Sequence, residues 1–149
     1  MNMKKALCIE LDTMLDIRIQ DTNTAIEATM ESRDSESKSS AGDKYETGRE
    51  MIQIELGKYQ DQLEKYIKLK KAISQIDAAK NHSTVGFGSL VRTNQGNYFV
   101  SVGLGMVVVR DEKYFAISLA SPIGNALEGQ KADSVVRFQD REIKILEVQ

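Results

Sequence analysis

The stretch from Ile52 to Ile73, IQIELGKYQDQLEKYIKLKKAI, decides the fold of the first half of this chain. Its apolar and aromatic residues recur at alternating spacings of four and three, which is the period of a seam along one face of an α-helix. The seam consists of Ile52, Leu56, Tyr59, Leu63, Tyr66, Lys70 and Ile73. The pattern predicts one long helix of the coiled-coil type over residues 44–79.

A second helical pattern lies before it, over residues 3–32. Its seam begins with large apolar residues and becomes smaller and more polar toward its end, which indicates closely packed helices. The seam residues are Leu7, Leu11, Met14, Leu15, Thr22, Ala25, Ile26 and Thr29. The serine-rich stretch SRDSESKSSAGD separates the two patterns, so we predict an antiparallel helical hairpin with its tip loop near residues 34–46.

The composition of the chain changes near residue 82. The residues before it contain no proline and only three of the ten glycines, whereas the residues after it contain the sole proline and many β-branched side chains. Six short segments there have the composition of strands, and NQGN supplies a hairpin turn between the first two. They are GSLVRT, NYFVSVG, MVVVRD, KYFAISL, DSVVRF and REIKILEV.

One short helix is predicted between the fourth and fifth of these segments, in SPIGNALEG. Ser121 is a favourable N-cap, Pro122 suits the first helical position, and Gly129 suits a left-handed exit. The fold class is therefore α+β. An antiparallel coiled-coil hairpin over residues 1–82 precedes a small antiparallel β-sheet domain with one short helix over residues 83–149.

Charge and composition argue against several classes of function. With 20 Lys and Arg against 22 Asp and Glu, the chain lacks the basic excess that drives non-specific binding of nucleic acid. Glu10 and Asp12 interrupt the first apolar run, so we expect neither a secretory signal nor a membrane partner, and a cytoplasmic location. Cys8 is the single cysteine, which excludes an internal disulfide and fits a reducing compartment.

Catalytic groups are also scarce. His82 is the only histidine and has no Cys or His neighbours at metal-ligand spacing, so a zinc site is not expected. One cysteine and one histidine do not supply a nucleophile, a base and an orienting group. We therefore expect a protein that is not an enzyme on its own and has no small-molecule substrate.

The tip of the hairpin carries two carboxylates in the sequence Gly42-Asp43-Lys44-Tyr45-Glu46. Judged locally, Asp43 is a good N-cap for the second helix and Glu46 completes a capping box. A pair of carboxylates on an exposed tip also has the oxygen ligands that Mg²⁺ prefers. Both interpretations can hold together, because a capping carboxylate keeps free lone pairs.

The carboxy-terminal third resembles a known family. The stretch FAISLASPIGNALEGQKADSVVRF, followed by IKILEV, is similar to the carboxy-terminal domain of the bacterial GreA/GreB transcript cleavage factors, in which a strand, a Ser-Pro-led helix and two closing strands recur. The order of elements along the whole chain also matches. The resemblance implies that the β domain has an FKBP-like fold and that the Gly-Asp-x-x-Glu signature of the family falls on Gly42, Asp43 and Glu46.

The resemblance also implies a function. The carboxy-terminal domain would bind RNA polymerase at the rim of its secondary channel, with Ser121, Pro122 and Ile123 in the contact. The hairpin tip would reach the polymerase centre, where Asp43 and Glu46 would help to hold a shared Mg²⁺ and promote cleavage at the backtracked RNA 3′ end. No tightly bound cofactor is implied, and the polymerase would remain the enzyme.

Two alternatives stay open. After Glu46 the chain continues Thr47-Gly48-Arg49-Glu50 where the family usually has Asn-Ala-Glu-Tyr, so a channel regulator that does not promote cleavage also fits. A coiled-coil adaptor of the same architecture is the third possibility.

Overall fold

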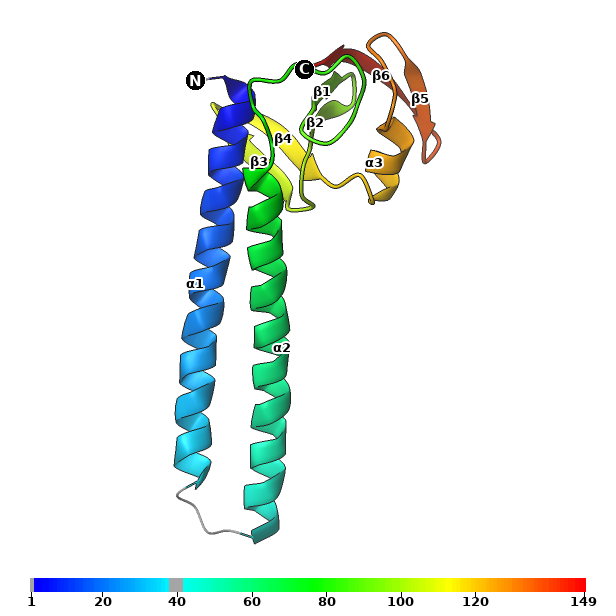
Figure 1. Cartoon of the computed structure of the whole chain (residues 1–149). Helices are drawn as coiled ribbons and strands as arrows, with labels where there is room; N and C mark the ends of the chain where they lie inside the picture. The colour runs from blue at the N-terminus through cyan, green and yellow to red at the C-terminus, as the bar shows by residue number, and fades with distance from the viewer. Residues whose placement is uncertain (1, 38–41) are drawn as a thin grey trace. The chain divides into compact units, whose positions relative to one another are not determined.

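The structure is a computed structural model that describes the backbone of residues 2–37 and 42–149, and the side chains of residues 2–34 and 46–149 (Figure 1). The described chain forms two compact units. The first contains residues 1–13 together with residues 71–149, and the second contains residues 14–70. The sequence divides the chain by composition near residue 82, whereas the two units divide the long helices themselves.

The two long helices are α1 (Met3–Ser37) and α2 (Gly42–Ser74). Asn2 caps α1, because its side-chain oxygen accepts a hydrogen bond from the backbone N–H of Lys5 at 2.7 Å. The prediction of a helix over residues 3–32 is confirmed, and the observed helix continues to Ser37. Within this helix the Ser32 hydroxyl donates a hydrogen bond to the Ala28 carbonyl, four residues earlier.

The predicted end of the second helix at residue 79 is wrong, since α2 ends at Ser74. The N–H groups of Gln75 and Ile76 bond to carbonyls three residues back, which tightens the chain out of the α-helix. Asp77 then accepts a hydrogen bond from the N–H of Ala79 and forms a turn. Local hydrogen bonds of the backbone and of Asp77 therefore replace the α-helix where the apolar pattern alone would continue it.

Within the unit of residues 14–70, α1 and α2 run antiparallel. Lys70 forms an ion pair with Asp16, and the guanidinium of Arg18 lies 5.9 Å from the centre of the Tyr66 ring. The predicted seams are inside: Leu15, Leu56, Thr22 and Thr29 are buried. Each buried threonine donates its hydroxyl to the carbonyl four residues earlier, which satisfies the polar atom without a partner on the other helix.

The rest of the chain forms a six-stranded sheet in the order β3-β4-β2-β1-β6-β5. The strands are β1 (Leu90–Thr93), β2 (Gly96–Val100), β3 (Gly105–Val109), β4 (Glu112–Ile117), β5 (Val135–Phe138) and β6 (Arg141–Val148). All six predicted strand segments are confirmed. The β1–β2 turn is at Asn94 and Gln95, because Thr93 pairs with Gly96.

The prediction of an antiparallel sheet needs a correction, because β2 and β4 are parallel. The chain leaves β2 and passes to the outer position of β3, and the β3–β4 hairpin then brings β4 back into the place beside β2. A strand that returns in this way runs in the same direction as β2. The sheet is therefore mixed, and the FKBP-like description stays a prediction.

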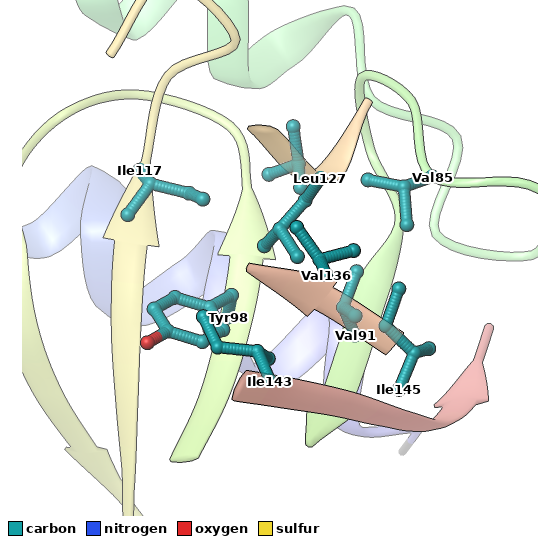
Figure 2. Close-up of a cluster of buried hydrophobic side chains, with 9 residues drawn as sticks. Val85, Val91, Tyr98, Ile117, Leu127, Val136, Ile143 and Ile145 are labelled. Carbon is teal, nitrogen blue, oxygen red and sulfur yellow. The ribbon is translucent and has the colours of Figure 1, made fainter. Parts of the chain in front are cut away.

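One face of the sheet carries the main core (Figure 2). Its buried side chains come from β1, β2, β4, β5 and β6. Val85, which precedes β1, and Leu127, in the short helix α3 (Pro122–Leu127), complete it. They are Val85, Val91, Tyr98, Val100, Ile117, Leu127, Val136, Ile143 and Ile145. The other face is buried too, through Leu90, Phe99 and Tyr114. Leu7, Leu11 and Ile73 of the long helices are buried in the same unit.

Helix α3 is built as the sequence predicts. Ser121 has an extended backbone and its hydroxyl oxygen accepts a hydrogen bond from the N–H of Gly124 at 3.1 Å. Pro122 occupies the first helical position, where no N–H is needed. Gly129 follows with φ of 79°, the left-handed conformation that glycine adopts without strain.

Candidate functional site

The two predicted tip carboxylates lie in the first turns of α2. The helix begins at Gly42, so Asp43 is already inside it and not at the N-cap position that the capping-box interpretation requires. The Asp43 side chain lies outside the described residues, whereas the Glu46 side chain is described and exposed. Positions three apart on a helix lie on one side of it, so positions 43 and 46 share a face of α2.

The surface beside Glu46 is an open groove along α2. Its described lining comes from that one helix and combines charged with apolar groups: Glu46, Arg49, Glu50, Gln53 and Ile54. A neighbouring groove continues past the exposed side chains of Met51 and Ile54, which are 66% and 61% accessible. Such an open surface suits contact with a macromolecule better than enclosure of a small ligand.

Two carboxylates supply only part of the coordination shell of a Mg²⁺ ion. Within residues whose side chains are described, no group of three or more His, Cys, Asp or Glu side chains could hold a metal ion. Mg²⁺ in proteins is often held by one or two carboxylates, with waters and substrate phosphates completing its shell. Asp43 and Glu46 could supply these carboxylate ligands only if another molecule supplied the remaining ligands of the ion.

The three predicted contact residues at the start of α3 have different surroundings. The Ser121 hydroxyl is used inside the domain, because it caps α3 and also donates to the Ser118 carbonyl at 2.7 Å. Ile123 is half-buried and packs against the core. Pro122 is exposed, as is Asn125 one turn later. The surface that α3 offers to a partner is therefore centred on Pro122 and Asn125.

The sequence did not reveal a buried lysine near the start of α1. Lys4 is 4% exposed and its Nζ donates to the Lys80 carbonyl at 2.6 Å and to the Gln149 carbonyl at 3.4 Å. Burial lowers the pKa of Lys4, and burial likewise raises the pKa of the nearby Cys8 thiol. This environment stabilises a protonated thiol, so Cys8 is not activated as a nucleophile.

A second polar cluster lies on the sheet face opposite the main core. Arg92 contacts Glu112 at 3.2 Å and Glu147 at 3.8 Å, and its guanidinium lies 5.8 Å from the centre of the Tyr114 ring. The Tyr114 hydroxyl donates to Glu112 at 2.7 Å. Hydrogen bonds from Tyr114 and Arg92 lower the pKa of Glu112, so the carboxylate stays charged. The cluster joins β1, β4 and β6 across the sheet, and we assign it a structural role.

The pKa of His82 is lowered by burial and by the positive charges of Lys4 and Lys80. Among the described residues, no helix has an apolar stretch long enough to span a membrane.

Comparisons with known proteins include a distant likeness to a solved structure. The chain matches no protein-family model and no curated protein sequence. A solved structure described as that of the transcription factor Gfh1 aligns with 93% of this chain and 93% of its own, at 16% sequence identity and a TM-score of 0.39. A likeness of this size establishes neither a shared family nor a shared function.

Proposed function

We propose that this chain is a transcription elongation factor that binds RNA polymerase and stimulates cleavage of backtracked RNA. In this proposal the surface around Pro122 on α3 contacts the polymerase, and the end of the hairpin where α2 begins enters the secondary channel. Asp43 and Glu46 act there, inside the active site of the polymerase. The chain itself is not an enzyme.

The observation that carries the proposal is the local construction of α3. The motif by which the sequence resembles the Gre factors, SPIGNALEG, forms a capped helix between a strand and two closing strands. Two antiparallel helices, α1 and α2, precede the sheet in the same chain, and the first turns of α2 carry the acidic pair. This combination of a motif with its expected neighbours supports the proposal more than either feature alone.

In this proposal the hairpin supplies only part of a metal site. Asp43 and Glu46 would hold one side of a Mg²⁺ ion whose remaining ligands come from the polymerase and the RNA phosphate, and that ion supplies electrostatic stabilisation of an in-line displacement. The role of this chain is to deliver two carboxylates on one helix face. A helix start is suited to this task because its backbone fixes the spacing of the two side chains.

The direct test is transcript cleavage in a backtracked elongation complex with Mg²⁺ and the cognate RNA polymerase. We expect the wild-type chain to accelerate cleavage and Asp43→Asn/Glu46→Gln to lose most of that acceleration while still binding. The matched control is Asp61→Asn/Glu64→Gln, which removes the same two charges from exposed positions of α2 and should keep the acceleration. Equal activity of the two double variants would refute a role for the tip acids.

Polymerase binding is tested separately. Pro122→Arg and Asn125→Arg place a bulky charge on exposed positions of α3, and we expect both to weaken binding. Gln75→Arg, at an exposed position outside α3, is the control. If all three variants bound the polymerase equally, the contact surface would have to be elsewhere.

A second candidate is a channel regulator that does not promote cleavage. It is favoured by the residues after the acid pair, because Gly48 lies in the first two turns of α2 and weakens the helix by ~1 kcal/mol relative to alanine. Lys44 also adds a positive charge between the acids. Confirmed binding without accelerated cleavage would select this candidate, and failure to bind polymerase would leave the coiled-coil adaptor.

A further inference from the structure

Strand β3 forms one edge of the sheet and has a free hydrogen-bonding side. It pairs only with β4 among the described strands, through a two-residue turn at Arg110 and Asp111, both of which have positive φ. In such a hairpin Val109 and Glu112 form a hydrogen-bonded pair, and pairs of this type alternate along the ladder. The backbone N–H and C=O groups of Met106 and Val108 therefore point away from β4.

The same two residues expose their side chains. Met106 is 53% accessible and Val108 is 51%, and Met106 lies opposite Phe115, which is 37% accessible. Phe115 in turn lies beside Tyr98, with ring centres 5.9 Å apart, so these side chains share the face of the main core. That core includes no residue of β3. Met106, Val108 and Phe115 thus form an apolar surface, called here the β3 surface, that α3 leaves uncovered.

The opposite edge of the sheet is protected, which gives an internal comparison. Strand β5 has the same kind of two-residue turn, at Gln139 and Asp140, so its outward-facing residues are Val135 and Arg137. A charged side chain at an edge discourages pairing with another strand, and α3 contacts β5 as well. Strand β3, with the sequence GMVVV, contains neither a charge nor a proline. Its edge carries none of these protections.

We infer that the β3 surface binds an extended segment of a partner protein, which joins the sheet as an additional strand beside β3. The segment would have apolar residues at alternating positions, to cover Met106, Val108 and Phe115. It would also carry a carboxylate, because the exposed Lys113 lies opposite Val108 on the same face and has no ion pair within the described residues. Backbone hydrogen bonds would supply affinity, and the alternating side chains would supply specificity.

A second copy of this chain fits the surface less well. Two β3 strands could pair about Val107, but a five-residue strand is only ~17 Å long. Contact between two such edges is far smaller than the ~1,200 Å² that specific stable interfaces bury. It would also leave the apolar face open on both copies. A separate segment can pair with the edge and fold over the face at once.

The test uses the full chain, labelled with ¹⁵N, and a capped synthetic peptide in which valine alternates with threonine and one valine is replaced by glutamate. We expect saturable shifts of the Met106 and Val108 amide signals, and no shifts along β5. A peptide of the same composition without the alternation should not bind. Exchange of the glutamate for lysine should weaken binding several-fold, because it places like charges together at Lys113.

Two proline variants distinguish a loss of binding at the β3 edge from a general loss of folding. Val108→Pro removes an N–H that makes no bond to β4, and should weaken binding about tenfold. Val135→Pro makes the same change on the β5 edge and should leave the affinity unchanged. If the Val108→Pro protein does not fold, Val108→Lys repeats the test. This variant keeps the backbone N–H of the strand and adds an edge charge of the kind that β5 already has at Arg137.

Three results would overturn the inference. The first is no shift at millimolar peptide, and the second is equal binding by Val108→Lys and the wild type. The third is a concentration-dependent shift of the same amides without peptide, accompanied by a dimer in sedimentation, which would assign the β3 surface to a second copy. None of these results depends on RNA polymerase binding or transcript cleavage.

Discussion

The substitution Gly124→Ala tests how α3 is fixed to the sheet. Gly124 is buried, and a Cβ at this position would lie 2.0 Å from the Ser118 carbonyl oxygen and 3.0 Å from the Cα of Leu119. Ordinary van der Waals contact begins near 3.4 Å, and the atoms in the way belong to backbone that cannot rotate aside. The end of β4 and the start of α3 must therefore move apart by on the order of 1 Å.

The size of the effect follows from two opposing contributions. Overpacking of this kind costs about 1–3 kcal/mol or more, and we place the backbone clash at the upper end of that range. Alanine favours helix over glycine by about 1 kcal/mol, which offsets part of the loss. We expect a net destabilisation of about 2 kcal/mol, which lowers the melting temperature of a domain of this size by about 10 °C.

Near-UV circular dichroism is the suitable assay for this change. Tyr98 and Tyr114 are buried in the sheet and report on the packing of this unit during heating. The control is Gly103→Ala, at an exposed position in the same unit where an added Cβ meets nothing within 4 Å. It should be neutral or stabilising by up to about 1 kcal/mol. A Gly124→Ala protein as stable as Gly103→Ala would refute the proposed contact with Ser118.

The remaining predictions concern the helices and the response to acid. Leu11→Ala deletes a fully buried side chain and should cost about 2–5 kcal/mol in urea unfolding, and a loss below 1 kcal/mol would contradict tight packing around it. Gly57→Ala adds a methyl group where nothing lies within 4 Å and should stabilise α2 by about 0.5–1 kcal/mol in thermal far-UV circular dichroism, and an unchanged or lower stability would contradict open space at this position. Hydrogen bonds from Tyr114 and Arg92 lower the folded-state pKa of Glu112, so their stabilisation is present above the unfolded-state pKa, near 4.3, and disappears as the pH falls through the folded-state value. The melting temperature of wild type should therefore exceed that of Glu112→Gln at neutral pH and approach it in acid, and a gap that did not change with pH would contradict the cluster.

Much of the fold could be predicted because its signals are local. The seam from Ile52 to Ile73 requires only the period of a helix, and the burial of Leu56 and Ile73 agrees with it. Ser121, Pro122 and Gly129 delimit α3 through backbone geometry that each residue type prefers by itself. Helix ends were less predictable, because the chain leaves α2 through hydrogen bonds from Gln75 and Ile76 to carbonyls three residues back, which the apolar pattern does not signal.

The candidate site was also only partly predictable from the sequence. The sequence placed Asp43 and Glu46 at the start of the second helix, and the backbone agrees. It also proposed Ser121, Pro122 and Ile123 together as contact residues, yet only Pro122 keeps an exposed side chain that is not used in capping or in the core. Burial and bonding depend on neighbours that are distant in sequence, so spacing along the chain did not reveal this difference.

The sequence by itself therefore determined which segments become helices and strands, where α3 begins and ends, and which carboxylates the hairpin carries. Only the tertiary structure decided the strand order, the parallel pairing of β2 with β4, and the edge position of β3. The reason is that helix periods, caps and turns are set by bonds between near neighbours, whereas the partner of a strand is set by packing of the whole sheet. The open edge at Met106 and Val108 is visible only once that partner is known.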